Sequence, residues 1–344
     1  MSICAVPWFR MEVHENRLCP CNLIHPQLFW HAKRSRYWDF LEDGVKPLVN
    51  SLQYQQFRTS MAATEAEGAC GAERRCGAPS AFPNLPVHAL PSIAENYRLV
   101  KEDWEARSPI LRGVPPVWTV STGARCDMRC VMCPIDHSLD IPPLTTDAAT
   151  QLREAAELAL NWTVVGGEPL HSPAAVLDSI LPTPHPCRKV MMLTSLSAPT
   201  DVVAAIIDRL THITVSLCAP SERIYNKVQV GGNFRWVMDN IQLAVPRTIA
   251  DCSQIIMAST LPTLAYMGPF LDDLGFQFLT PTPMVNIKGP DEEDIFGKAA
   301  TDATTRELIR QRELAEELTA GRNIVCNWGI FDSALLRLRT RFNL

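Results

Sequence analysis

Residues 121–133 read Ser-Thr-Gly-Ala-Arg-Cys-Asp-Met-Arg-Cys-Val-Met-Cys, with Cys126, Cys130 and Cys133 in a C-x3-C-x2-C pattern. With 12 cysteines in 344 residues, random placement would give this spacing only about 0.015 times, so the pattern indicates a shared metal centre. A four-iron cluster normally takes four thiolates, and three ligands from one loop leave one iron open to another molecule. The stretch therefore favours an iron–sulfur cluster. The alternative is a zinc site, because Cys130, Cys133 and His137 also have zinc-ligand spacing.

The cysteine pattern resembles the cluster motif of the radical S-adenosylmethionine (radical SAM) enzymes, in which the open iron chelates the amino and carboxylate groups of the cofactor's methionine. The resemblance places Met132, the residue before the last cysteine, against the adenine of SAM. It implies a [4Fe-4S] cluster on the three cysteines and SAM as the second cofactor. In this family the reduced cluster cleaves SAM to a 5′-deoxyadenosyl radical, which abstracts hydrogen from the substrate.

A second motif, Gly166-Gly167-Glu168-Pro169, follows a predicted strand. By itself Gly-Gly-Glu is a common turn, but its position resembles the GGEP element of the radical SAM family. There the glycines let the backbone approach the methionine part of SAM, because a glycine has no Cβ. The resemblance implies that the backbone or Glu168 accepts hydrogen bonds from the methionine ammonium.

A third resemblance covers residues 216–241 and concerns the fourth-strand signature of the same family. It implies that Ser216 donates a hydrogen bond to the ribose of SAM. The family's Asp-Gly is replaced here by Cys218-Ala219, and its arginine is replaced by Gln229, so no role is carried over to those positions. Thr194, at the end of another predicted strand, is a further candidate for binding the cofactor.

From Val117 the chain alternates short apolar runs with amphipathic runs, which predicts an α/β fold with a parallel sheet. The resemblance implies a partial (β/α)6 radical SAM barrel, in which chemistry collects at the carboxyl ends of the strands. The predicted strands are 117–121, 162–165, 189–194, 212–217, 254–259 and 276–279. The predicted helices between them are 146–160, 173–181, 201–210, 234–245 and 263–274.

The first eighty residues contain five further cysteines. Alternating residues from Phe9 to Val13 predict a strand that returns through residues 18–21 as a hairpin, and a helix is expected over residues 53–62. This layout resembles the twitch or SPASM module, which carries an auxiliary iron–sulfur cluster. A zinc site and a metal-free module remain alternatives, because the spacing of the last cysteine pair is unusual. The candidate ligands are Cys4, Cys21, Cys70 and Cys76, with Cys19 as the substitute.

The predicted domain organisation has four parts. Residues 1–80 form the small hairpin-plus-helix module, and residues 81–115 form a proline-rich linker with a helix over 93–107 that starts at a Ser92–Glu95 capping box. Residues 116–290 form the partial barrel. Residues 291–344 form a helix over 301–320 and a truncated SPASM-like tail, in which Cys326 is expected to be buried.

Charge and hydropathy exclude several classes of protein. The net charge of −5 and pI near 5.9 argue against a nucleic-acid partner, since no basic stripe is present. No apolar run reaches the length of a membrane span and no signal pattern opens the chain, so we expect a cytoplasmic protein without a membrane partner. In a reducing compartment cysteines favour metal ligation over disulfides.

Together these features predict a radical SAM oxidoreductase or maturase, with an oxidation or crosslink in a peptide as its reaction. Dehydrogenation of a sugar or small alcohol by the same chemistry is the alternative. A hypothesis from another class is a degenerate, non-catalytic scaffold that binds an iron–sulfur cluster or zinc. The expected partners are a peptide or small-molecule substrate and an electron donor such as a flavodoxin or ferredoxin. Asp136 and His137, beside the cysteine loop, are interpreted as structural.

Overall fold

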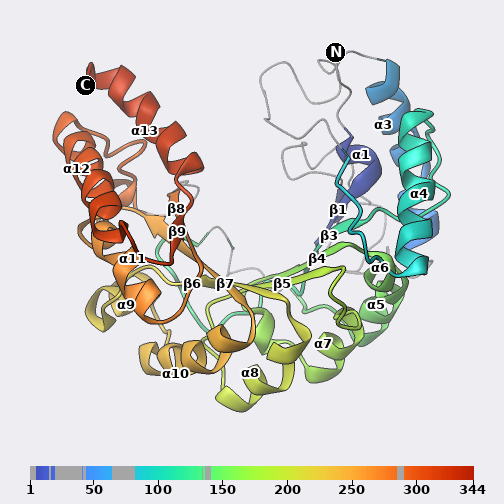
Figure 1. Cartoon of the computed structure of the whole chain (residues 1–344), viewed down its shortest axis with the longest axis horizontal. Coiled ribbons are helices and arrows are strands. Elements are labelled where there is room, and N and C mark those ends of the chain that lie inside the picture. The colour runs from blue at the N-terminus through green and yellow to red at the C-terminus, as the bar shows by residue number, and fades with distance from the viewer. Residues whose placement is uncertain are drawn as a thin grey trace. The chain divides into compact units, whose positions relative to one another are not determined.

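The computed structural model describes residues 5–14, 17–19, 41, 44–63, 82–133, 135, 141–284 and 290–344. The strands of this part of the chain follow the order β2-β1-β3-β4-β5-β6-β7-β8-β9 in one sheet. Figure 1 shows the described helices and strands. Strand β2 is antiparallel to β1, whereas the β1–β3, β3–β4, β6–β7, β7–β8 and β8–β9 ladders are parallel. The predicted α/β class with a parallel sheet, as in a partial radical SAM barrel, is confirmed. Candidate ligands Cys4, Cys21, Cys70 and Cys76, and also Asp136 and His137, lie outside the described residues.

The chain divides into two compact units, and the first comprises residues 1–125 and 140–191. Its strands are β1 (Arg10–His14), β2 (Arg17–Cys19), β3 (Val117–Ser121) and β4 (Asn161–Val165). Its helices are α1 (Val6–Phe9), α2 (Val45–Val49), α3 (Leu52–Ala63), α4 (Pro91–Glu105), α5 (Thr146–Gln151), α6 (Arg153–Leu158) and α7 (Ala174–Ile180). The boundary between the units falls within β5 (Lys189–Thr194).

The predicted N-terminal hairpin is present as β1 and β2, and it continues the sheet. Strand β1 pairs in parallel with β3, so that Glu12 lies opposite Thr119. On the other face of β1, Met11 and Val13 are completely buried. The alternation in the sequence revealed the strand and its buried face, but not the neighbour with which it pairs, because pairing depends on residues more than a hundred positions away.

Helix α4 confirms the predicted helix but not its predicted start. Pro91 is the first helical residue and Leu90 is the N-cap, without a side-chain cap. Proline suits this position because its φ is fixed near the helical value. The first N–H groups of a helix have no partner within the helix, so the absence of an N–H in proline breaks no helical hydrogen bond. The Ser92–Glu95 capping box is therefore wrong. The Glu95 carboxylate instead accepts hydrogen bonds from the guanidinium of Arg98 at 2.9 and 2.7 Å.

The second unit comprises residues 126–139 and 192–344. Its strands are β6 (His212–Ser216), β7 (Ile249–Ile256), β8 (Phe278–Pro283) and β9 (Val325–Cys326). Its helices are α8 (Thr200–Ile206), α9 (Glu222–Val228), α10 (Phe234–Ala244), α11 (Leu264–Asp273), α12 (Asp302–Thr319) and α13 (Gly329–Phe342). None of the described helices has the length and apolarity needed to cross a membrane.

Strand β7 starts five residues before the predicted start. Its buried residues alternate as Ala250, Cys252, Gln254 and Ile256, and the half-exposed residues between them include Asp251 and Ser253. The start of this strand was not recognised in the sequence because both of its faces carry small or polar residues. A prediction from periodicity needs one face to be clearly more apolar than the other.

The C-terminal segment continues the α/β alternation. Residues Val325 and Cys326 form β9, which pairs with β8, and α13 follows. The predicted helix over 301–320 is confirmed as α12, and Leu264, Leu308 and Phe331 from α11, α12 and α13 share one fully buried core. The residues interpreted as the opening of a SPASM-like tail thus form a strand and the start of a helix. Cys326, expected to be buried, is only half-buried.

Candidate functional site

The three cysteines of the C-x3-C-x2-C loop are half-buried residues of the second unit. A tight turn connects two of them, since the Cys133 N–H donates to the Cys130 carbonyl at 3.0 Å. Burial, and after it the neighbouring thiols of Cys133 and Cys126, raise the pKa of the Cys130 thiol to about 12. A metal bound to this loop would stabilise the thiolate form of its cysteines.

Backbone hydrogen bonds hold the loop against the end of α9 and the residues that follow it. The N–H groups of Arg129 and Val131 donate to the carbonyls of Val230 and Val228, at 2.7 and 2.9 Å. These bonds run between main-chain atoms, so they fix the path of the loop whatever its side chains are. The loop that carries the thiols is therefore a fixed part of the second unit, and Met132, the predicted adenine contact, lies half-exposed in its turn.

The Gly231-Gly232 pair completes this attachment. Gly231 has φ +90°, and a Cβ there would lie 3.0 Å from the Asp127 carbonyl oxygen. A Cβ on Gly232 would lie 2.4 Å from the Tyr225 hydroxyl and 2.9 Å from the Met128 sulfur. The two glycines are thus explained by close packing against the cysteine loop, which needs residues without a Cβ.

The Gly166-Gly167-Glu168 motif lies in the first unit and packs on the backbone of residues 122–125. The N–H groups of Gly167 and Glu168 donate to the carbonyls of Gly123 and Arg125, both at 2.8 Å. A Cβ on Gly167 would lie 2.4 Å from the Arg125 oxygen. The structure therefore supplies a reason for Gly167 that the family resemblance did not contain, namely close contact between two backbone segments.

Glu168 is 1% exposed, and its carboxylate Oε1 accepts a hydrogen bond from the N–H of Leu170 at 3.1 Å. This bond caps the short 3-10 helix at Pro169–His171. A buried carboxylate is stable only with such partners. Its assignment to the SAM ammonium stays a prediction, because the observed bond is internal to the motif.

Thr194 ends β5 and belongs to the second unit. Its hydroxyl oxygen accepts from the Leu196 N–H at 2.9 Å, and Leu196 has φ +56°, a conformation that is costly for a branched side chain. Asn240 stabilises this turn, because its Nδ2 donates to the carbonyls of Leu196 and Ala198, both at 2.8 Å. Thr194 thus shapes a strained turn at the carboxyl end of a strand.

Ser216 ends β6, and Gln229 organises the residues after it. The Gln229 side chain accepts from the Cys218 N–H at 2.9 Å and donates to the Ser216 carbonyl at 2.8 Å. Gln229 is 1% exposed, so its side chain is shielded from water, and the bond to Cys218 is buried. The residue that replaces the family's arginine therefore clamps the backbone that positions Ser216. Burial, and after it the Cys130 thiol, raise the pKa of the Cys218 thiol to about 12.

Replacement of Gln229 by alanine should lower the free energy of unfolding by about 2 kcal/mol, because each buried backbone group left without a partner costs about 1–3 kcal/mol. Chemical denaturation measures this change. The matched control is Gln56→Ala, at an exposed position of α3, which should change stability by no more than about 0.5 kcal/mol. Equal effects of the two substitutions would contradict the clamp.

Ser259, just beyond β7, lies between two charged side chains. Its hydroxyl accepts from the Lys227 ammonium at 2.8 Å and donates to the Glu293 carboxylate, and its N–H donates to the same carboxylate at 2.7 Å. The sequence alone does not reveal these partners of Ser259. Gln229, Asn240 and Glu293 were all missed, because a polar residue that bonds to the backbone of a distant segment has no sequence signature.

In the first unit, Cys19 is the described member of the auxiliary-cluster candidates. It lies on β2 opposite Glu12 of β1 and is 4% exposed. Tyr54 lies close by, since burial and the charges of Cys19 and Glu12 raise its pKa, while Arg58 lowers it. The described cysteine is thus in a buried, polar part of the hairpin.

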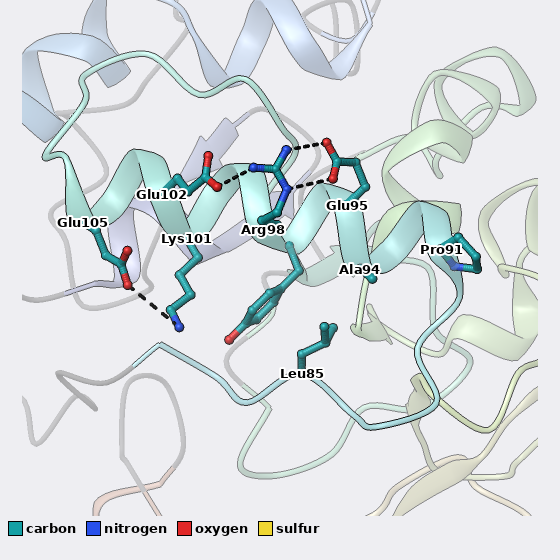
Figure 2. Close-up of a pocket in the computed structure, with 9 residues that line it drawn as sticks. Leu85, Pro91, Ala94, Glu95, Arg98, Lys101, Glu102 and Glu105 are labelled. Carbon is teal, nitrogen blue, oxygen red and sulfur yellow. Dashed lines mark hydrogen bonds and ion pairs between the residues drawn. The ribbon is translucent and has the colours of Figure 1, made fainter.

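A cavity of 590 Å³ lies beside α4 in the first unit, and its charged side chains pair with one another (Figure 2). Arg98 contacts Glu95 and Glu102, and Lys101 lies 3.8 Å from Glu105. None of the predicted site residues lines it. The lining residues are Leu85, Pro91, Ala94, Glu95, Tyr97, Arg98, Lys101, Glu102 and Glu105.

Comparison with known proteins gives one family and several similar structures. Residues 120–264 match the model of the Radical SAM superfamily. No curated protein matched the sequence. Streptococcus suis SuiB bound to precursor peptide SuiA is 14% identical, with a TM-score of 0.51 over 75% of this chain and 60% of that chain.

Two further structures are similar. A second SuiB structure has a TM-score of 0.50 and 14% identity over 68% of this chain and 53% of that chain. Native anSMEcpe with bound AdoMet has a TM-score of 0.49 and 12% identity, over 64% of this chain and 66% of that chain. This chain thus spans between 53% and 60% of the length of these two SuiB chains. Residues 120–264 are therefore similar to the Radical SAM superfamily, a family that implies a [4Fe-4S] cluster and SAM as cofactors.

Proposed function

We propose that this chain is a radical SAM maturase that oxidises or crosslinks a peptide. The observation that carries the proposal is the cysteine loop, in which the thiols of Cys133 and Cys126 act on the Cys130 thiol and the backbone is fixed by two hydrogen bonds to residues 228–230. Three thiolates from one loop suit a four-iron cluster with one open iron. With SAM bound to it, such a cluster supplies a 5′-deoxyadenosyl radical.

The residues of the chain would bind and orient the cofactors. Cys126, Cys130 and Cys133 would hold the cluster. The predicted SAM-binding residues are Met132, Gly166, Gly167, Glu168, Thr194 and Ser216. The half-buried polar face of β7 and β8 supports a polar substrate: it carries Asp251 and Ser253 on β7 and Thr280 and Thr282 on β8. There the Thr280 hydroxyl donates to the Asp251 carboxylate at 3.1 Å.

The peptide substrate is proposed by analogy of fold. SuiB, whose structure contains a precursor peptide, shares the fold at low identity, and peptide groups are the kind of donors and acceptors that a hydroxyl-rich face binds. A flavodoxin or ferredoxin would supply the electron. An auxiliary cluster in the N-terminal module, as in twitch and SPASM proteins, would accept an electron from the substrate.

The radical chemistry is tested with the full chain, reconstituted without oxygen with iron and sulfide. We expect about four iron and four sulfide per cluster, and formation of 5′-deoxyadenosine that requires both SAM and dithionite. A protein that carries its full complement of iron and never cleaves SAM would instead support a scaffold.

The substrate class is tested with two uniformly deuterated pools, one of peptides from a digested protein and one of sugars. Abstraction from a peptide should transfer deuterium from the first pool into 5′-deoxyadenosine. Transfer from the sugar pool alone, or from neither pool, would contradict the peptide assignment while leaving the SAM cleavage result intact.

A further inference from the structure

The β1–β2 hairpin brings together one carboxylate, one imidazole and one thiol, those of Glu12, His14 and Cys19, which we call the hairpin cluster. Glu12 and Cys19 are directly paired across the two strands, so their side chains lie on the same face. His14 is two residues from Glu12 on β1 and therefore projects to that face as well. The local geometry of the hairpin alone is enough to gather the three groups.

The ligand atoms of the hairpin cluster are close to the spacing of a metal site. The carboxylate oxygen, ring nitrogen and sulfur all lie within 4.8 Å of one another. Around a tetrahedral zinc ion, with bonds of about 2.0–2.3 Å, ligand atoms are about 3.3–3.6 Å apart. The distance of 3.8 Å between His14 Nε2 and Glu12 Oε2 is already near that spacing.

Burial and charge favour a cation at this position. Glu12 is 3% exposed and Cys19 is 4% exposed, and an ionised group that is removed from water needs a compensating charge. Arg10 is one such partner, since its guanidinium lies 2.8 Å from Glu12 Oε1. The other oxygen, Oε2, faces His14 Nε2 at 3.8 Å. Arg10 thereby orients Glu12 so that one oxygen points toward the imidazole and remains on the cluster side.

The position of the hairpin cluster in the sheet is that of a functional site. Glu12 aligns with Thr119 of β3, and Thr119 aligns with Thr163 of β4, so the cluster shares a face with partly exposed threonines. His14 is the last residue of β1, and the carboxyl ends of parallel strands are where α/β proteins place their chemistry. The opposite face of β1 is entirely apolar, as Met11 and Val13 show.

We propose that the hairpin cluster binds one Zn²⁺ ion through a Glu12 oxygen, a His14 nitrogen and the Cys19 sulfur. The mixed oxygen, nitrogen and sulfur set suits zinc, a borderline metal, whereas iron–sulfur clusters select thiolates. Three protein ligands leave a fourth tetrahedral position for water or a donor atom of another molecule. The site is independent of the SAM cleavage proposed above, because none of its ligands belongs to the cysteine loop.

The proposal competes with the sequence-based expectation that Cys19 is a substitute ligand of an auxiliary iron–sulfur cluster. The two assignments differ in what they require of the neighbouring residues. An iron–sulfur cluster bound by cysteines would need Cys19 but not Glu12 or His14. A zinc ion would need all three, and would lose affinity with each replacement.

Zinc X-ray absorption distinguishes the two, because it is specific for the element and is not disturbed by iron. The wild-type chain is first reconstituted with iron and sulfide and then incubated with one equivalent of Zn²⁺. We expect one sulfur and otherwise nitrogen or oxygen ligands around zinc. Zinc with only sulfur ligands, or zinc removed by gel filtration, would overturn the proposal.

Variants then identify the ligands in the same full chain. Glu12→Gln, His14→Ala and Cys19→Ser should each weaken zinc binding at least about 10-fold, since even residues that only support a ligand contribute that much. The matched control Cys187→Ser, a buried cysteine of the same unit, should bind zinc as the wild type does. If Cys19→Ser lowers the iron content while the Glu12 and His14 variants bind zinc normally, the auxiliary-cluster assignment is correct and the zinc site is not.

Discussion

Replacement of Cys130 by serine is expected to reduce formation of 5′-deoxyadenosine at least about 100-fold. Residues that merely support a ligand contribute roughly 10- to 100-fold to metal affinity, and Cys130 is proposed as a ligand itself. Its thiol is the one whose pKa the thiols of Cys133 and Cys126 both raise, so it interacts with both of them. The measurement is 5′-deoxyadenosine released from SAM under dithionite, together with the iron content after anaerobic reconstitution. Cys126→Ser and Cys133→Ser should behave in the same way.

The control for the cysteine variants is Cys252→Ser. Cys252 is completely buried in β7 of the same unit and has no predicted role as a ligand. We expect it to retain its iron and its SAM cleavage, with some loss of stability because a hydroxyl replaces a buried thiol. Should Cys130→Ser keep full iron content and full SAM cleavage, the loop would not be the cluster site and the proposed function would fail with it.

Replacement of Gly167 by alanine is expected to lower the free energy of unfolding by about 3 kcal/mol, the upper end of the range for overpacking. The added Cβ would lie 2.4 Å from the Arg125 carbonyl oxygen and 2.5 Å from that of Ala124. Both are backbone atoms, which cannot rotate away as a side chain can. Because Arg125 directly precedes Cys126 in the chain, we also expect the variant to lose most of its SAM cleavage. Denaturation and the 5′-deoxyadenosine assay measure the two effects.

Gly329→Ala is the matched control for this prediction. A Cβ on Gly329 would lie 3.7 Å from the Asn327 side chain, an ordinary contact, at the first residue of α13. Alanine there should leave stability unchanged or raise it by up to about 1 kcal/mol, because it restricts the unfolded chain. Near-wild-type stability of Gly167→Ala would show that the backbone contact with residues 124–125 is not required.

The strands differ in how well they could be predicted from sequence. Strand β3 and strand β5 have the predicted bounds, because each is an apolar run bordered by breaks in the pattern. Strand β7 was placed too late, since Asp251 and Ser253 interrupt its apolar residues. Strand β9 was missed, because two residues are too few to show a period.

The residues of the site also differ in whether their roles could be predicted from sequence. The spacing of Cys126, Cys130 and Cys133 is a local property, so the sequence alone was sufficient to propose a shared metal centre. The role of Gln229 could not be predicted from the sequence, because Gln229 acts through two hydrogen bonds to backbone groups of Ser216 and Cys218. A family comparison marked Gln229 as a departure, and only its contacts explain why the chain accepts it.

The sequence by itself determined that this protein has a parallel α/β fold and a three-cysteine loop. The spacing of apolar residues in helices and strands, and the spacing of the cysteines, are all properties of short segments of the chain. Tertiary structure decided that β1 joins the sheet beside β3, and that Gly167 and Gly231 pack against backbone near the cysteines. It also decided that Glu12, His14 and Cys19 converge. The physical reason is that these features are contacts between atoms brought together by folding, and the energy of such a contact depends on distance in space rather than on spacing along the chain.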